Sequence, residues 1–302
     1  MKIFSLILLL CLSVNVSAQS PVLFMPDTIS TRYKERDMTI SLDGNHLLYS
    51  IHNYQDDQRM IVEMKKTGKE WGQPKLVAFS GQYKDIEPMF TPDGSRLYFA
   101  SDRPLFEGDQ SMDYNIWYVD RTRKGWSIPV VLDSMINTDG DEFYPSVSNA
   151  GTLYFTATRP EGIGKEDIFY SLSQNGVFSK PIALGSAINT VTYEFNAFVD
   201  PDENYLLFSS YKRPDGLGSG DLYIAYRVHG QWQLAVNLGS EINSPDLDYC
   251  PFVSADGETL YFTSNRKIAH SISSVQELRE WMDRPQNGFD DIYCVPMNTI
   301  IK

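Results

Sequence analysis

Five carboxylates occupy one fixed place in a sixteen-residue segment that the chain repeats five times. The segment begins at residues 29, 79, 136, 188 and 242, and its seventh place holds Glu35, Asp85, Glu142, Glu194 and Asp248. Carboxylates at a shared point can bind a cation such as Ca²⁺ or a partner's basic group. They can also accept hydrogen bonds that hold neighbouring repeats together. We favour this structural role, because a group present in every repeat is most simply explained by what every repeat needs.

Four arginines follow the same periodicity as the carboxylates. Each begins the loop after the second predicted strand of its repeat: Arg103, Arg159, Arg213 and Arg266. A guanidinium group there can pair with the seventh-place carboxylate of its own repeat, or bind a ligand carboxylate through two parallel hydrogen bonds. We favour the first of these pairings.

Four short strands per repeat must position these residues. Asp-Gly turns at 43–44, 93–94 and 256–257 join a short strand to a second strand rich in aromatic and β-branched residues. A third strand follows a loop, and a fourth follows a Gly-containing turn. No amphipathic helix separates the strands, so each unit of 50–57 residues is predicted to be an antiparallel meander. Repeated meanders of this length are typical of β-propeller blades.

The last unit lacks its own fourth strand, and the start of the chain is placed to supply it. Residues 21–25, with the sequence PVLFM, precede the first repeat as the fourth strands precede the later repeats. Closure in this way leaves no open sheet edge. We therefore predict an all-β, five-bladed propeller in one domain, 19–302; a six-bladed ring would need a blade that the sequence lacks. The predicted blades are 29–78, 79–135, 136–187, 188–241, and 242–302 completed by 21–25.

The repeat pattern IN(T/S)…E…P…LYFTS.R…G.G..DIY…G.W..P..L resembles the WD40-like propeller repeats of TolB-type proteins. The likeness covers nearly the whole chain after residue 18. Such repeats also occur beside peptidoglycan-binding OmpA-like domains in bacterial envelopes. We expect no OmpA-like domain here, so the resemblance implies the fold and an envelope setting without carrying over wall binding.

The first eighteen residues are predicted to be a secretory signal that is cleaved after Ala18. Their apolar run from Ile3 to Leu12 is too short to span a bilayer, and no later stretch reaches about 20 apolar residues. Cys11 follows the bulky Leu10 inside the apolar run, so we do not expect a lipoprotein. The sequence therefore predicts an exported protein, periplasmic or extracellular, without a transmembrane segment.

The charge balance limits the partners. After removal of residues 1–18 the chain has 25 basic and 39 acidic residues. A surface this acidic repels nucleic acid and anionic lipid, and it fits soluble partners or cations better. Cys250 and Cys294 fall on the first and third strands of one blade. These strands are about 10 Å apart, beyond the roughly 7 Å limit for a disulfide, so we predict free thiols.

An insertion at 267–289 interrupts the last repeat. Its sequence SSVQELREWMDR has helical spacing, with Ser273 or Ser274 as the N-cap, and it carries Glu277, Arg279 and Trp281. A helix in this loop is expected over or beside the channel mouth. It could act as a lid or a docking element, or it could be a family decoration packed through Trp281.

No catalytic motif stands out in the sequence. The four histidines lack HExxH or zinc spacing, and there is no GxSxG motif. We therefore predict a non-catalytic module, with no required cofactor, that binds a protein or envelope component at the loop face around the channel mouth. The five seventh-place carboxylates are expected to form a ring at this mouth. The alternative is a glycoside hydrolase-like five-bladed propeller with catalytic carboxylates around the axis. Against it, catalysis needs acids in unequal surroundings, and these acids follow the repeat.

Overall fold

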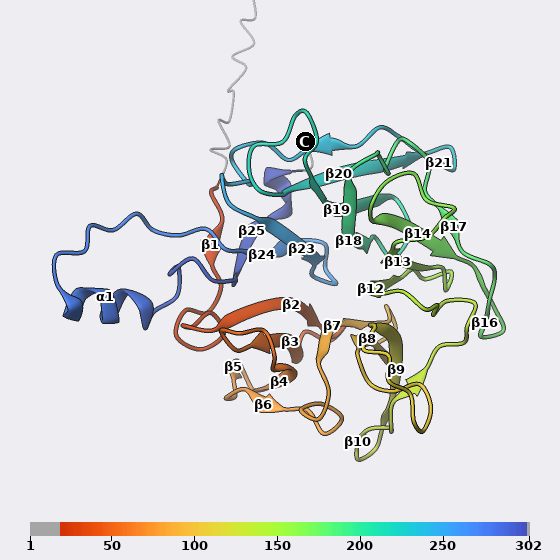
Figure 1. The fold of residues 1–302 in the computed structure, drawn as a ribbon, viewed down its shortest axis with the longest axis horizontal. Helices are drawn as coiled ribbons and strands as arrows, with labels where there is room; N and C mark the ends of the chain where they lie inside the picture. Colours follow the sequence, from red (N-terminus) through yellow and green to blue (C-terminus); the bar gives the residue numbers. More distant parts are fainter. Residues whose placement is uncertain (1–18, 301–302) are drawn as a thin grey trace, which may run out of the picture.

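A computed structural model describes residues 19–300 of the chain. Residues 1–18, which carry the predicted signal peptide, and residues 301–302 lie outside the described part. Five antiparallel sheets are arranged in a ring, with α1 (Val275–Met282) and the short 3₁₀ turn Met297–Thr299 as additions (Figure 1). The chain is a five-bladed β-propeller, as the sequence predicts.

The blades follow one another in chain order, and each is a small antiparallel sheet. Blade 1 contains β2 (Lys34–Ile40), β3 (His46–His52), β4 (Arg59–Thr67), β5 (Glu70–Trp71) and β6 (Lys75–Leu76). Blade 2 contains β7 (Asp85–Phe90), β8 (Arg96–Ser101), β9 (Asn115–Thr122), β10 (Gly125–Trp126) and β11 (Val130–Val131). Blade 3 contains β12 (Glu142–Val147), β13 (Leu153–Ala157), β14 (Asp167–Ser171) and β17 (Ile182–Ala183), with a hairpin of β15 (Ser173–Gln174) and β16 (Val177–Phe178).

The last two blades are built in the same way. Blade 4 contains β18 (Tyr193–Val199), β19 (Tyr205–Tyr211), β20 (Asp221–Val228), β21 (Gln231–Trp232) and β22 (Val236–Asn237). Blade 5 contains β23 (Asp248–Val253), β24 (Thr259–Ser264), β25 (Asp291–Pro296) and the N-terminal strand β1 (Val22–Leu23).

The two ends of the chain meet in blade 5 and close the ring. β1 runs antiparallel to β25, with Val22 opposite Cys294 and Leu23 opposite Tyr293 (Figure 1). The backbone N–H of Phe24 donates to the carbonyl of Ile292 at 2.8 Å, which extends the pairing. The predicted closure is therefore confirmed, and it covers the sheet edge that blade 5 would otherwise expose.

A β-bulge bends the first strand of every blade. The pairing register shifts after the eighth place of each repeat. The ninth residue then has a positive φ of 48–59°: Asp37, Glu87, Tyr144, Asn196 and Cys250. The first strands begin at 34, 85, 142, 193 and 248, three or four residues earlier than the sequence suggests. The seventh-place carboxylates thus lie on the strands themselves, since the bulge lets the strand continue through a bend.

The core consists of aromatic and aliphatic side chains packed between adjacent blades. Phe155 and Phe169 of blade 3 stack at 6.0 Å, and Phe208 and Tyr223 of blade 4 repeat the arrangement at 5.9 Å. All four are fully buried. Each such side chain stabilises the fold by roughly 1.5–3 kcal/mol through apolar burial, so the ring is held by many similar contacts.

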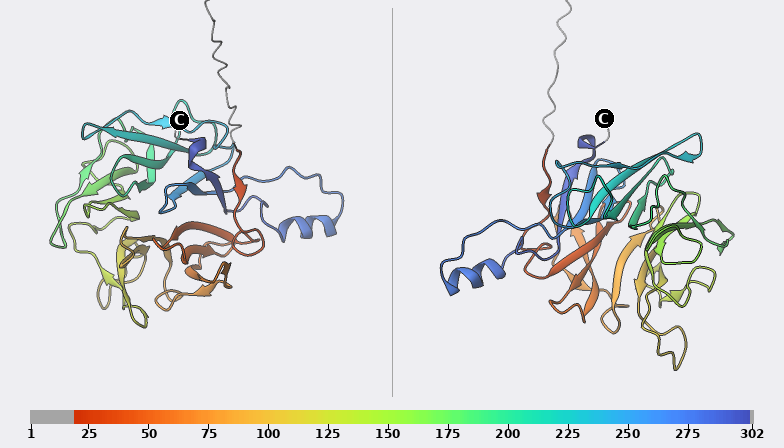
Figure 2. Two further views of the ribbon diagram at one scale, coloured as in Figure 1. Left: turned by 180° about the vertical axis from the view of Figure 1, so that it is seen from behind. Right: turned by 45° about the horizontal axis from the view of Figure 1, so that its top comes forward.

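The insertion forms the predicted helix, but the helix does not cover the channel. Ser274 is the N-cap of α1 and accepts a hydrogen bond from the Glu277 N–H. α1 extends outward from the rim of the ring, and none of its residues is buried (Figure 2). Its apolar residues Val275 and Met282 are at least half exposed, and the helix is tied to blade 1 at its C-terminal end by the ion pair between Arg32 and Asp283. Within residues 19–300, no helix is long and apolar enough to cross a membrane.

Both cysteines of the described chain are free thiols, as predicted. Cys250 is buried at the bulge of β23, and Cys294 is half-buried on β25. One strand, β24, separates them in the sheet order, which accounts for the lack of a disulfide between them.

Candidate functional site

The five seventh-place carboxylates lie at the joints between blades and are fully buried. Glu35, Asp85, Glu142, Glu194 and Asp248 all have 0% exposure. In four of them the backbone N–H donates to a carbonyl of the preceding blade at 2.8–2.9 Å; the acceptors are Asp290, Tyr114, Glu166 and Gly220. The residue therefore links two blades through its main chain, whatever its side chain binds.

The four predicted arginines pair with four of these carboxylates. Arg159 lies 2.8 Å from Glu142, Arg213 lies 3.0 Å from Glu194, and Arg266 lies 2.5 Å from Asp248. Arg103 makes the same ion pair with Asp85. Buried pairs of this kind are costly to break, because the remaining charge is left without compensation.

Each arginine also binds the segment that enters its blade. One guanidinium N–H donates to the carbonyl of the first repeat residue; the acceptors are Phe79, Ile136, Ile188 and Ile242. The guanidinium carbon Cζ of each arginine lies 4.6–5.5 Å from the centres of two rings on the second and third strands, for example Phe155 and Phe169 for Arg159. The structure thus pairs each predicted arginine with the acid of its own blade, at the residue whose backbone N–H reaches the preceding blade in blades 3, 4 and 5. A ligand-binding ring of five carboxylates stays a prediction.

Glu35 is the exception among the five. Its carboxylate accepts hydrogen bonds from the Thr31 N–H at 3.0 Å and the Thr31 hydroxyl at 2.5 Å. In the described chain it has no basic partner within ion-pair distance. Burial raises the pKa of Glu35 to about 8, with a further contribution from the Asp291 and Asp290 carboxylates. Burial also raises the pKa of Glu142, but there Arg159 opposes the shift.

The predicted residues of the insertion lie apart from the ring carboxylates. Glu277 accepts hydrogen bonds from the N–H and hydroxyl of Ser273 at 2.7 Å, and so serves the start of α1. Arg279 is exposed, and Trp281 is half-buried with an indole N–H that has no partner in the described chain. Their role in partner choice stays a prediction.

A buried polar network that sequence reasoning missed closes the propeller axis. Glu87 in blade 2 accepts from Arg36 at 3.3 Å, from the Tyr144 N–H at 2.7 Å and from the Asn196 amide at 3.2 Å. Arg36 also pairs with Asp37 at 2.7 Å. These contacts join four blades, so the side chains must converge at the centre. Burial and the nearby Asp37 raise the pKa of Glu87.

A signal for this network exists in the repeat. The network uses the ninth place, which holds a different residue in every blade: Asp37, Glu87, Tyr144, Asn196 and Cys250. The seventh place is always acidic and proves to be part of the joint. The ninth place varies because its side chains meet at the axis, where each blade contributes a different group to one shared network.

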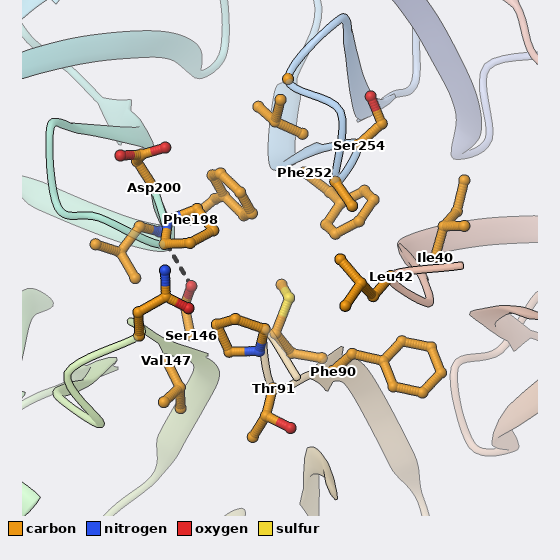
Figure 3. Close-up of a pocket in the computed structure, with 18 of the residues that line it drawn as sticks. Ile40, Leu42, Phe90, Thr91, Ser146, Val147, Phe198, Asp200, Phe252 and Ser254 are labelled. Atoms are coloured by element: carbon orange, nitrogen blue, oxygen red, sulfur yellow. Dashed lines mark hydrogen bonds between the residues drawn. The ribbon is translucent and has the colours of Figure 1, made fainter. Parts of the chain in front are cut away.

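The other mouth of the channel holds a hollow with a mixed apolar and polar lining, which we call the central depression. It has a volume of about 380 Å³ and is lined by all five blades. Apolar side chains at the ends of the first strands and in the turns after them surround it (Figure 3): Ile40, Leu42, Met89, Phe90, Val147, Phe198 and Phe252. Phe198 and Phe252 meet edge to face at 5.7 Å. Its acidic residues are Asp200, Asp202 and Asp256, and no Lys, Arg or His belongs to its lining.

The central depression was also missed from the sequence, although its pattern is visible there. The twelfth place of each repeat is always apolar: Ile40, Phe90, Val147, Val199 and Val253. Such a residue before a turn looks like ordinary strand core. Only the ring geometry places all five ends around one hollow, at the opposite end of the first strands from the seventh-place carboxylates.

The comparisons with known proteins show the fold. No protein-family model matches the chain, and no curated protein matches it. A solved structure assigned as TolB, from Agrobacterium tumefaciens, is 14% identical with a TM-score of 0.52, covering 87% of this chain and 90% of its own. The α-L-arabinofuranosidase PaAbf62A from Podospora anserina is 12% identical with a TM-score of 0.51, covering 92% and 94%.

A third similar structure is CoXyl43, a GH43 β-xylosidase/α-arabinofuranosidase from a compost microbial metagenome. It is 9% identical with a TM-score of 0.52, covering 91% of this chain and 94% of its own. At these identities the likeness supports a β-propeller and does not separate a TolB-like protein from a glycosidase. The resemblance to TolB-type repeats therefore stays a prediction beyond the fold itself.

Proposed function

We propose that the chain is an exported, non-catalytic binding module that holds a segment of a partner protein in the central depression. The observation that carries this proposal is the convergence of all five blades on one hollow that is lined by apolar and acidic side chains. Leu42 at its edge is 61% exposed. The aromatic side chains around it, Phe90, Phe198 and Phe252, are only 5–7% exposed, so Leu42 is the apolar side chain that a partner seated in the depression would bury.

The charge of the depression favours a particular kind of segment. Asp200, Asp202 and Asp256 belong to its lining, without a basic residue to balance them. The whole chain is also acidic, with a formal charge of −13. Complementary charge speeds encounter and fixes the register of a bound partner. The fitting partner is therefore a peptide segment with apolar side chains between Lys or Arg residues.

The surroundings of the axial carboxylates support binding over glycoside hydrolysis. A glycosidase needs two accessible carboxyl groups several ångströms apart, with room for the sugar between them. Asp37 and Glu87 are 1% and 3% exposed and are held by Arg36. The hydrolase reading keeps one supporting feature, since two carboxylates in unequal surroundings do lie at the axis.

A peptide-binding assay with a matched pair of variants tests the proposal. Leu42→Lys places a positive charge at the depression, and Leu234→Lys places it at an apolar residue that is 75% exposed outside the depression. We expect Leu42→Lys to weaken binding of a Lys-flanked apolar peptide by about tenfold, while Leu234→Lys binds as the wild type does. Equal binding by both variants, or no preference for Lys-flanked over Asp-flanked peptides, would contradict the proposal.

The hydrolase alternative needs a separate assay. We expect no sugar release from a panel of plant and bacterial glycans. Release that is lost in Glu87→Gln, with folding retained, would instead establish the enzyme.

A further inference from the structure

Four of the five blade joints are completed by an arginine of the same blade, and the joint of blade 1 is not. In blade 2, Asp85 is paired with Ser101 across the sheet, and Arg103 follows two residues later. In blade 1, Glu35 is paired with Ile51, so Asn53 takes the place of the arginine. In blade 4, Glu194 is paired with Ser210 and the arginine, Arg213, follows three residues after that serine. The residue three places after Ile51 in blade 1 is Tyr54. Neither residue is basic.

The space of the missing arginine is a cavity. In blade 2 the guanidinium of Arg103 lies beside Phe99 and Trp117, which face each other across β8 and β9. The matching pair in blade 1 is Tyr49 and Val62. Both of these residues, together with Glu35 and Ile51, lie around a cavity of about 570 Å³, with Glu35 and Tyr49 at its inner end, where they are 0% and 1% exposed. We call it the blade 1 cavity.

The charge of this joint is left uncompensated within the described chain. Glu35 is fully buried and accepts hydrogen bonds from Thr31 alone. Asp291 beside it has a carboxylate oxygen, Oδ1, without a hydrogen-bond partner in residues 19–300, as have its counterparts Asp167 and Asp221 in other blades. Burial raises the pKa of Asp291 to about 7, and it also raises the pKa of Asp167 and Asp221 in the blades that have their own arginine.

One basic residue lines the cavity, and it is already engaged. Arg32 donates to Asp283 at 2.6 Å and to the Tyr33 hydroxyl at 3.0 Å, and its side chain is 44% exposed. Asp283 and Pro285 come from the insertion that carries α1, and they form part of the cavity wall. The insertion thus contributes to this cavity and offsets the charge of Arg32.

We propose that the blade 1 cavity binds a guanidinium group supplied by a ligand, in the place that the chain's own arginines occupy in the other blades. Glu35 would accept the guanidinium N–H groups through charge-assisted hydrogen bonds, with its carboxylate already oriented by Thr31. By its place in the repeat, Ile29 corresponds to Ile136, whose carbonyl accepts an N–H of Arg159 in blade 3. Tyr49 supplies the aromatic face that Phe155 supplies to Arg159.

The ligand class is therefore an arginine side chain of a partner protein or a small guanidinium compound. The cavity is large enough for either, since ligand pockets span roughly 300–1,000 Å³. It lies at the start of β2, whereas the central depression lies beyond the end of that strand. The inference thus stands apart from the proposed function, and either can fail without the other.

Calorimetric titration with agmatine, a small guanidinium compound, tests the site. We expect wild-type protein at pH 8.5 to bind agmatine with a Kd on the order of 1 mM and to show at least about tenfold weaker binding of L-citrulline, whose side chain is a neutral isostere. Glu35→Gln should weaken agmatine binding by about tenfold or more. Glu142→Gln, the same change at a joint that has its own arginine, should bind agmatine as the wild type does.

A second variant protects the test against a failure of folding. Asn53→Arg supplies the missing guanidinium from within the chain, so it should raise the melting temperature and abolish agmatine binding. A blocked arginine tripeptide titrated in parallel distinguishes the two sources, because tighter binding of the tripeptide indicates a partner's side chain. Equal binding of agmatine and citrulline, or unchanged agmatine binding in folded Glu35→Gln, would overturn the proposal.

Discussion

The joint of blade 3 and the joint of blade 1 use the same acid in different ways. Glu142 and Glu35 both accept from a threonine four residues earlier, through its N–H and its hydroxyl. Glu142 also forms an ion pair with Arg159 at 2.8 Å, so its negative charge is balanced within its own blade. Glu35 forms no ion pair within the described chain, and it lies beside the blade 1 cavity. The difference teaches that a repeated carboxylate can be neutralised by a cation built into its own blade or, as we propose for Glu35, by the cation of a ligand.

The largest effect should come from breaking the ion pair between Arg159 and Glu142 in the joint of blade 3. Arg159→Met keeps much of the side-chain volume over Phe155 but leaves the Glu142 carboxylate buried without its cation. We expect the free energy of unfolding to fall by about 3–5 kcal/mol, measured by urea denaturation. The double variant Arg159→Met/Glu142→Gln should recover part of this loss. A fall in the free energy of unfolding below about 1 kcal/mol would mean that these ion pairs contribute little to the stability of the fold.

The second largest effect should be a pH dependence of the unfolding free energy that comes from the blade 1 joint. The folded-state pKa of Glu35, about 8, exceeds its ordinary value of 4.5. The folded chain therefore binds more protons between these pH values, and stability falls as pH rises from about 4.5 to 8. Asp291 acts in the same direction, and Asp290 and Arg32 are the other charged groups around this joint.

Glu35→Gln removes the titrating group of the open joint. We expect its stability relative to the wild type to improve by at least about 1.4 kcal/mol between pH 5 and pH 8, since one pKa unit corresponds to that energy. Urea denaturation at the two pH values measures the change, with Glu107→Gln at the exposed surface as the control. If the stability difference between Glu35→Gln and the wild type were the same at pH 5 and pH 8, Glu35 would have its ordinary pKa in the folded chain.

The smallest effect should follow removal of the α1 helix. Replacing residues 274–284 by a Gly/Ser linker deletes Asp283 and leaves the blades intact, because no residue of α1 is buried. We expect a change in unfolding free energy below about 1 kcal/mol, together with a reduction of agmatine affinity by about two- to fivefold. A large stability loss would show that the insertion belongs to the core of the ring.

Much of the fold could be predicted because turns and strands are local. Asp-Gly pairs such as Asp43-Gly44 mark hairpins, and the place of residues 21–25 before the first repeat indicated the closing strand. The bulges could not be predicted, because a positive φ is unusual for Glu87 and Tyr144 and nothing local requires it. The helix start at Ser274 was correct, but its position outside the ring depends on tertiary contacts that the sequence does not encode locally.

The candidate sites were harder to predict than the fold. The pairing of Arg213 with Glu194 followed from their shared period, yet the burial of all five carboxylates did not. The central depression and the blade 1 cavity arise where residues from different repeats converge. The sequence does contain one clue to the second, since Asn53 interrupts the series of loop arginines.

Carbon-13 NMR titration of the Glu35 side-chain carboxyl, with and without agmatine, tests the central claim most directly. We expect a titration midpoint of about 8 in the free protein. Agmatine should lower it by at least about one pH unit, because a bound guanidinium favours the ionised carboxylate. A midpoint near the ordinary value of 4.5 that agmatine leaves unchanged would contradict the account.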